Sequence, residues 1–227
     1  MTADAAGLQI ATFDGPQDDR LPDFLIHDGH WLGDVTAVQG IVLPGQGESV
    51  ARGFLEMGAP CVYLGAAALM DSGIVERLAL AYGPQHVGVF VPVARMEVSW
   101  SLETQSNADF RTVAPSHCEP AWEILGDDGG RTGTLVQWWL AAMFEQGASS
   151  AIIRVDIHDD TDLNLCAELV ERFGDKLWFA PRSAVGNRFD DWLRWGKATR
   201  LAVPIAMLEN DPDLRAWSAG AQEPAAA

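Results

Sequence analysis

The sequence has few cysteines, few basic residues and no long apolar run. Its three cysteines, Cys61, Cys118 and Cys166, are far apart in the 227 residues and form no CxxC pair. An odd, scattered set of cysteines favours a reducing compartment over a disulfide-stapled secreted fold, so we expect a cytoplasmic protein. Residues 1–7 also lack the basic and apolar regions that are typical of a secretory signal.

Negative charge dominates the composition. Fifteen Lys and Arg residues stand against 32 Asp and Glu residues, which gives a formal net charge of −17. Such a chain repels polyanions, so we expect neither nucleic acid nor an anionic membrane as a partner. Any anionic ligand would need a local cluster of positive charge. No apolar run reaches the length of about 18 residues that spans a bilayer.

Hydrophobic residues make up 48% of the chain, which is enough for one globular domain with a sizeable core. We expect this domain to cover residues 1–219. The low-complexity segment GAQEPAAA, residues 220–227, is predicted to be a flexible C-terminal tail.

From residue 40 onward, short β-branched runs alternate with longer helical patterns. The predicted strands are 40–43, 60–64, 86–93, 150–157, 177–180 and 201–206, with two earlier ones at 8–13 and 23–27. The predicted helices are 48–57, 71–82, 132–146, 162–173, 187–195 and 211–217. This alternation predicts an α/β fold, the (β/α)8 TIM barrel. Segments 14–22 and 33–37 are short and rich in Gly, Pro and Asp, so the first two outer helices should be reduced or missing.

Two blocks carry the pattern of a known family. Residues 41–95 contain a glycine-rich strand end, the sequence VYLGAAAL, a helix start at Asp71 and a final Ala-Arg pair, and residues 147–165 form the second block. They resemble the histidine-biosynthesis barrels, which are the phosphoribosylformimino-aminoimidazole-carboxamide-ribotide isomerase and the cyclase subunit of imidazole glycerol phosphate synthase. The resemblance implies a TIM barrel that acts on substrates with a phosphate at each end, using two acidic residues at strand ends.

This sequence has one of those two acidic residues and lacks the other. Asp14 matches the acid of the first strand, whereas Val93 stands where the fifth strand has the second carboxylate. Asp156 and His158 follow the sixth strand and are the other catalytic candidates. A register slip of one residue decides whether Asp156 lies in the barrel mouth or faces the helices. The alternative for Asp156 is a structural carboxylate that pairs with Arg154 or caps a loop.

The phosphate sites that the resemblance implies are also partly retained. Gly45, Gly47 and Gly65 match glycines of the third and fourth loops, where a bare backbone allows N–H groups to approach a phosphate. In the later loops a carboxylate and two prolines replace glycines, and proline has no N–H to donate. Arg182 is the candidate that would hold an anion there, although an exposed arginine is commonly solvated or ion-paired.

Other clusters have simpler interpretations. Histidines and aspartates around residues 27–30 and 158–162 match no defined metal motif, so we expect no metal and no cofactor. His117 and Cys118 lack the further residues of a cysteine nucleophile site. Trp138 and Trp139 are adjacent on one predicted helix and therefore point about 100° apart. One should pack on the barrel, and the other either covers a loop or contacts a protein partner.

Two functions therefore stay open. The first is a diverged, non-orthodox or catalytically inactive relative of the isomerase that acts through protein–protein interaction. Its partner would be a second copy of the chain or another protein, because missing outer helices leave strands to be covered. The alternative is an enzyme, an isomerase or lyase, that acts on a small phosphorylated metabolite with Asp14 as acid or base.

Overall fold

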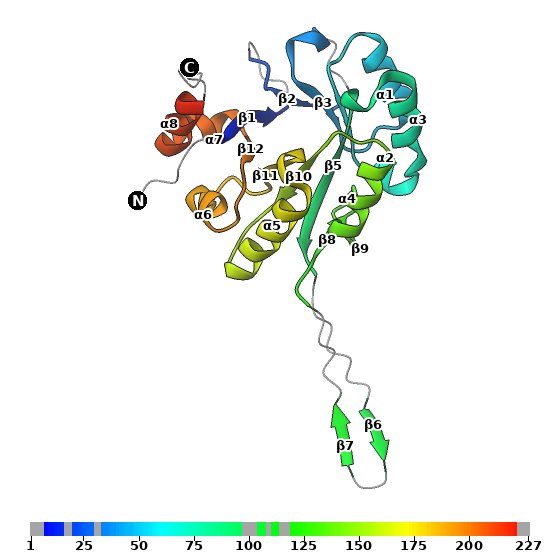
Figure 1. Cartoon of the computed structure of the whole chain (residues 1–227), viewed down its shortest axis with the longest axis vertical. Coiled ribbons are helices and arrows are strands. Elements are labelled where there is room, and N and C mark those ends of the chain that lie inside the picture. Colours follow the sequence, from blue (N-terminus) through cyan, green and yellow to red (C-terminus); the bar gives the residue numbers. More distant parts are fainter. Residues whose placement is uncertain are drawn as a thin grey trace.

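A parallel barrel forms the centre of the molecule. The computed structural model describes residues 7–15, 20–29, 33–96, 104–107, 110–113 and 119–221. The barrel strands are β1 (Gln9–Asp14), β2 (Phe24–Ile26), β3 (Gly40–Leu43), β4 (Val62–Leu64), β5 (Val87–Arg95), β10 (Ser150–Val155), β11 (Leu177–Pro181) and β12 (Arg200–Val203). Each pairs in parallel with the next, and β12 pairs with β1 to close the ring. This confirms the predicted TIM barrel (Figure 1).

Helices surround the barrel unevenly. They are α1 (Glu48–Glu56), α2 (Ala66–Met70), α3 (Gly73–Tyr82), α4 (Val136–Glu145), α5 (Asp160–Phe173), α6 (Phe189–Arg194), α7 (Ile205–Asn210) and α8 (Pro212–Ala221). Among the described residues, β1 and β2 have no helix between them, and β2 and β3 have only the 3-10 turn η1 (Val35–Ala37). The expected loss of the first two outer helices is therefore confirmed. Residues 222–227 of the predicted tail lie outside the described residues.

The segment after β5 differs from expectation. The predicted helix 132–146 begins only at Val136, because residues 131–135 form β9 (Arg131–Leu135). Strand β8 (Trp122–Leu125) lies antiparallel between the end of β5 and β9. Strands β6 (Thr104–Asn107) and β7 (Phe110–Val113) pair as a separate two-stranded sheet. The end of β5 thus carries a hairpin, β8–β9, into the region of the barrel mouth.

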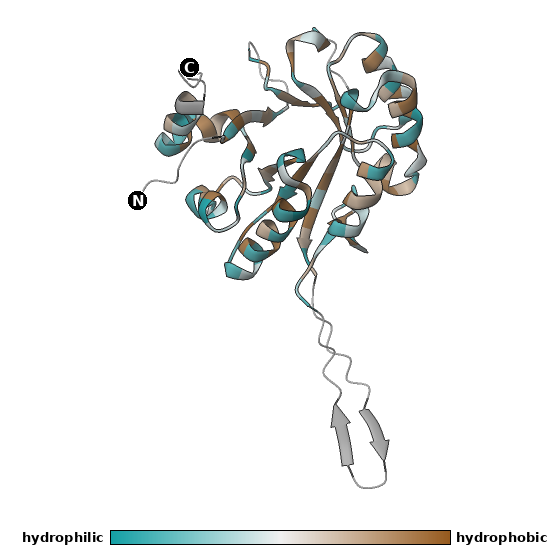
Figure 2. Cartoon of the chain, viewed as in Figure 1, coloured by the Kyte–Doolittle hydropathy of each residue, from teal (hydrophilic) through white to brown (hydrophobic). Residues whose placement is uncertain are grey.

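Aromatic side chains fill the barrel interior. Alternate residues of each strand point inward, and Phe13, Phe24, Tyr63, Phe90 and Trp178 form the bulk of this inner cluster. Gly40 and Gly88 make room for Tyr63, since a Cβ at either position would lie 2.6 Å from a carbon of its ring. In Figure 2 the central strands are largely brown, whereas the surrounding helices are both brown and teal. The interior is a packed core.

Two cysteines belong to the core. Cys61 and Cys166 are buried free thiols, and Cys118 lies outside the described residues. Burial raises the pKa of the Cys61 thiol to about 12 and raises that of Cys166 as well. A thiol that keeps its proton is a poor nucleophile, so both act as packing residues.

None of the helices in the described residues combines the length and apolarity needed to cross a membrane.

Candidate functional site

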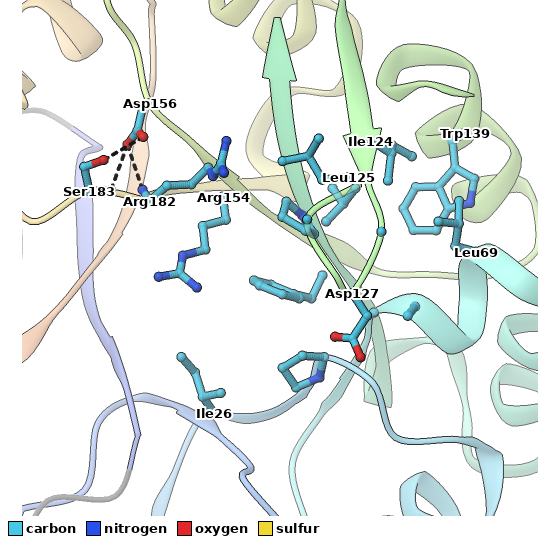
Figure 3. A pocket seen from close by; sticks show the side chains of 18 residues that line it. Ile26, Leu69, Ile124, Leu125, Asp127, Trp139, Arg154, Asp156, Arg182 and Ser183 are labelled. Atoms are coloured by element: carbon cyan, nitrogen blue, oxygen red, sulfur yellow. Dashed lines mark hydrogen bonds between the residues drawn. The ribbon is translucent and has the colours of Figure 1, made fainter. Parts of the chain in front are cut away.

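A cavity of about 380 Å³ opens at the carboxyl ends of the barrel strands. TIM-barrel sites lie at this end, and the volume falls in the range of small-molecule sites. The hairpin β8–β9 forms part of its wall. Its apolar lining includes Ile26, Leu69, Phe90, Pro92, Ile124, Leu125 and Trp139, and its polar side chains are Asp127, Arg154, Asp156, Arg182 and Ser183 (Figure 3).

Arg154 is the central charged residue of the cavity. It follows Ile152 by two positions on β10, so it shares the inward face of that strand. Its Nε is buried and has no hydrogen-bond partner among the described residues. Its guanidinium lies 6.0 Å from the centre of the Phe13 ring. Arg154 thus brings a positive charge and an unused donor into the cavity.

The surroundings of Arg154 disfavour its charge. Burial lowers the pKa of Arg154, the nearby Arg182 lowers it further, and Asp156 and Asp14 act in the opposite direction. A guanidinium stays protonated in proteins even so. The protein therefore keeps a positive charge in a place where it is under-stabilised, and an anion bound there would offset that cost.

Arg182 supplies a second positive charge to the cavity. It follows β11, and its Nη1 donates to the carbonyl oxygen of Val93 at 3.4 Å. Its backbone N–H donates to Val155 O at 3.2 Å and to Asp156 Oδ1 at 3.0 Å. Arg154 and Arg182 together form a local positive cluster in a strongly acidic chain. Such a cluster is what an anionic ligand needs here.

Asp156 lies in the mouth and also caps a loop. Its Oδ1 accepts from the backbone N–H of Arg182 at 3.0 Å and of Ser183 at 2.8 Å, and its Oδ2 accepts from the Ser183 hydroxyl at 2.8 Å. Both carboxylate oxygens are therefore used. The geometry makes Asp156 an anchor for the loop that presents Arg182.

The other catalytic candidates do not line this cavity. Asp14 ends β1 and accepts from the Gly15 N–H at 2.8 Å, close enough to Arg154 to stabilise its charge. His158 is exposed, and its backbone N–H donates to Asp162 Oδ2 at 3.0 Å. Val93 is buried in the outer core between barrel and helices. The structure thus brings Asp156 and Arg182 to the cavity, and places Asp14 beside its charge cluster.

Gly65 lines the cavity, and its role there is close packing of two loops. A Cβ on Gly65 would lie 2.3 Å from the carbonyl oxygen of Pro44, a distance that real structures do not tolerate. Its N–H donates to Leu43 O at 2.9 Å and is therefore already used. Gly45 lies against Asp127, whose Oδ2 would be 2.7 Å from an added Cβ. A phosphate beside Gly45 would meet that carboxylate.

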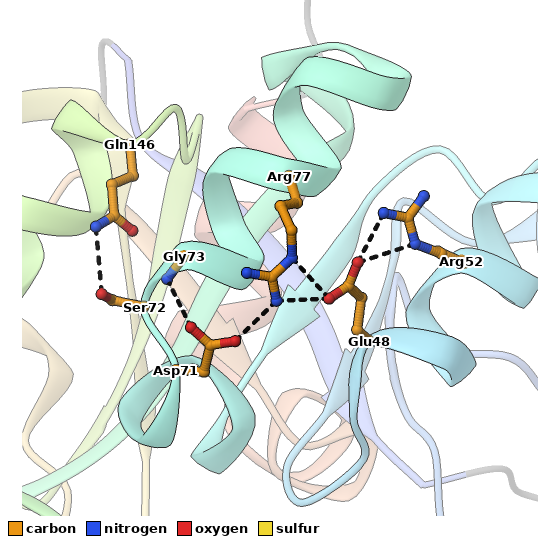
Figure 4. A network of polar contacts seen from close by, with 7 residues as sticks. All are labelled: Glu48, Arg52, Asp71, Ser72, Gly73, Arg77 and Gln146. Carbon is orange, nitrogen blue, oxygen red and sulfur yellow. Dashed lines mark hydrogen bonds and ion pairs between the residues drawn. The ribbon is translucent and has the colours of Figure 1, made fainter.

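Gly47 precedes helix α1, whose first turn already holds a carboxylate. Glu48 accepts from Arg77 Nη2 at 2.6 Å and from Arg52 Nη2 at 2.7 Å, and Asp71 also binds Arg77 (Figure 4). Arg77 and Arg52 hold the pKa of Glu48 below its usual value. A carboxylate at this helix start competes with any phosphate there. Gly47 does not line the cavity, so the cavity gives no support to its predicted role in binding phosphate.

Two residues of the cavity were missed by sequence reasoning. The sequence suggests Arg154 only as a partner for Asp156, although alternation from Ile152 places its side chain in the interior. Asp127 stands in the segment DDGG, residues 127–130, which is typical of a turn and does not by itself indicate a site. Its position depends on the pairing of β8 with β5, for which the local sequence carries no signal.

Two further expectations concern metal ligands and the adjacent tryptophans of α4. Within the described part of the chain, no group of three or more His, Cys, Asp or Glu residues is arranged to hold a metal ion. His30, His117 and Cys118 lie outside the described residues. On α4, Trp139 is 8% exposed and Trp138 is 67% exposed, so one packs inward and the other faces solvent.

The fold and the cavity define a TIM-barrel protein with a small site at its mouth, lined by two arginines and two aspartates. Comparison of the chain with protein-family models and with curated protein sequences gives no match.

Proposed function

We propose that the protein binds a small organic anion, a phosphorylated metabolite, in the mouth of its barrel. Arg154 and Arg182 hold the anionic group, and the apolar residues Ile26, Phe90 and Leu125 contact the organic part. The buried, unpartnered Nε of Arg154 is the observation that carries this proposal. The resemblance to the histidine-biosynthesis barrels supports a phosphate ester over a carboxylate.

In this proposal the protein is a diverged relative of the isomerase that binds its ligand without orthodox isomerase chemistry. The hydrogen bonds of Asp156 and the buried position of Val93 support it, since neither side chain offers a free carboxylate to a ligand. The alternative proposal is an isomerase or lyase that uses Asp14 as acid or base. The proximity of Asp14 to the charge of Arg154 supports that alternative.

Thermal-shift titration tests the binding proposal. A ligand that binds only the folded state at about one hundred times its Kd adds about 2.7 kcal/mol to the free energy of unfolding. We expect ribose 5-phosphate or aminoimidazole-carboxamide ribonucleotide to raise the melting temperature, and neutral ribose to leave it unchanged. Absence of a shift with every phosphate ester contradicts the proposal. With a ligand in hand, turnover that is lost in Asp14→Asn would favour the enzyme.

A second candidate function is contact with a protein partner, favoured by Trp138. A tryptophan that is 67% exposed leaves a large apolar surface in water, and tryptophan is enriched at interaction hot spots. The proposed partner is a second copy of the chain.

We expect Trp138→Arg to convert a homodimer into a monomer, measured by size-exclusion chromatography with light scattering. A charged side chain at the centre of an apolar contact would be desolvated without a partner. Trp195, which is 55% exposed on the loop after α6, is the matched control, and Trp195→Arg should remain dimeric. A monomeric wild-type protein, or a Trp138→Arg variant that stays dimeric, contradicts this candidate.

A further inference from the structure

The hairpin β8–β9 brings a carboxylate to the side of the cavity that faces the two arginines. Its first strand is fixed to the barrel by pairing of Ile124 with Val93 on β5. Its tip is closed by a hydrogen bond from Gly126 N to Gly130 O at 2.7 Å. Asp127 lies at this tip and points toward the cavity, and Arg154 and Arg182 lie across from it (Figure 3).

Among the described residues, the Asp127 side chain does not stabilise the turn of the hairpin. Its neighbour Asp128 builds the turn, since its Oδ1 accepts from Gly130 N at 2.8 Å. The Asp127 carboxylate instead reaches the third loop, where an added Cβ on Gly45 would lie 2.7 Å from Oδ2. A side chain at position 45 would require the Asp127 carboxylate to move from this place. The fold thus holds an available carboxylate at the edge of the cavity.

The cavity is therefore polar at both ends with opposite charge. Arg154 and Arg182 form the positive end, where the one lining carboxylate, Asp156, is bound to the backbone N–H groups of Arg182 and Ser183. Asp127 forms the negative end, and apolar residues such as Phe90 and Leu125 also line the cavity. A ligand with anionic groups at both ends would meet repulsion at Asp127. A ligand with an anionic group at one end and a hydrogen-bond donor at the other could bind the two arginines and Asp127 at the same time.

We infer that the ligand is a phosphate monoester that carries a protonated primary amine at its other end, joined by a short apolar spacer. The phosphate binds Arg154 and Arg182, and the ammonium binds Asp127. This inference rests on the proposed anion-binding function and narrows the class of ligand.

A series of ω-aminoalkyl phosphates tests the inference. Aminoethyl, aminopropyl and aminobutyl phosphates are titrated by calorimetry beside ethyl, propyl and butyl phosphates, which lack only the amine. Varying the spacer allows for the length of the cavity. At least one amine should bind more tightly than its alkyl partner, by about five- to tenfold, as expected for a charge-assisted hydrogen bond at a partly solvated site.

Two variants locate the amine. Asp127→Asn should reduce that ratio to about one while leaving alkyl phosphate affinity unchanged or improved, because one negative charge is removed near the anion. Asp128→Asn is the matched control: it removes the same charge one residue away, keeps the acceptor of the turn, and should retain the amine preference. Circular dichroism verifies that both variants are folded.

The outcomes separate the inference from the function on which it rests. Alkyl phosphates that bind as tightly as every amine would overturn the inference and leave anion binding intact. An amine preference that survives Asp127→Asn would also overturn it. Failure of all six compounds to bind, together with failure of ribose 5-phosphate, would overturn both proposals.

Discussion

Replacing Arg154 with methionine should weaken phosphate-ester binding by about 10- to 100-fold, the loss expected when a charged hydrogen-bond donor is removed from an anion. Arg154 is the inward-facing cation of β10, and its Nε has no other hydrogen-bond partner among the described residues. Arg182 is exposed, and its Nη1 already donates to Val93 O, so Arg182 by itself does not replace Arg154. Calorimetric titration with ribose 5-phosphate measures the change.

The same substitution should stabilise the ligand-free protein. Burial and Arg182 disfavour the charge of Arg154, and methionine fills similar volume without that charge. Replacing under-compensated buried charge with an apolar side chain commonly adds about 1–4 kcal/mol, and the exposure of part of this side chain favours the low end. The melting temperature should then rise by about 2–4 °C per kcal/mol for a domain of this size.

The stabilisation expected for Arg154→Met should not depend on pH. The pKa of Arg154 is lowered by folding, so folding disfavours its charged form wherever that form exists. Since arginine is charged at every accessible pH, the gain in Arg154→Met should be the same at pH 5 and pH 9. Arg188→Met, at an exposed position outside the cavity, is the control for loss of a surface charge. A lower melting temperature with unchanged affinity in Arg154→Met would contradict both expectations.

The barrel strands were predictable because their local sequence and their environment agree. The run from Val87 to Val93 is apolar throughout, as a strand buried on both faces must be, and β5 contains it. The short, Gly-rich segment before Gly40 similarly left no length for full helices. Both signals are local, and the structures that they predict are the ones that the parallel barrel needs at these positions.

The hairpin that shapes the site was not predictable in the same way. The predicted helix 132–146 includes residues 132–135, yet these belong to β9, which supplies partners to the buried Glu123. Arg131 Nη1 donates to Glu123 Oε1 at 2.5 Å, and Gly133 N donates to its Oε2 at 3.0 Å. These contacts join residues eight and ten positions apart. The position of Asp127 depends on these contacts, so the local sequence could not predict a carboxylate at this end of the cavity.

The register of β10 was the other open point, and strand alternation decides it. Ile152 belongs to the inner cluster, so Arg154 and Asp156 share its side of the strand. The resemblance alone allowed a slip of one residue. An unambiguous apolar anchor within the strand was the better guide to which side chains reach the mouth.

Replacing Asp162 with alanine should destabilise the protein by about 3 kcal/mol, because it leaves buried donors and part of a charge without partners. Asp162 is 1% exposed. It accepts from Arg95 Nε, Trp122 Nε1 and the His158 backbone N–H, each at 3.0 Å. These bonds connect β5, β8 and the start of α5.

This position also links stability to the site. Because Trp122 begins β8, loss of its partner should loosen the hairpin that carries Asp127, so Asp162→Ala should lose amine preference as well as stability. Thermal unfolding should show a fall in melting temperature of about 6–12 °C. Asp159→Ala is the milder comparison, since Asp159 is half exposed while it pairs with the same Arg95. A smaller fall in melting temperature for Asp162→Ala than for Asp159→Ala would contradict the stabilising role given to Asp162.

The pH dependence provides an independent check on this cluster. Arg95 holds the pKa of Asp159 well below its usual range, with help from the N–H groups of Asp162 and Thr161. A carboxylate whose pKa is lowered by folding stabilises the protein above its ordinary pKa and loses that contribution as acid protonates it. Wild-type stability should therefore decline below about pH 4, the ordinary pKa of Asp. Arg95→Met should reduce this decline, because without the guanidinium the folded and unfolded proteins bind protons more equally.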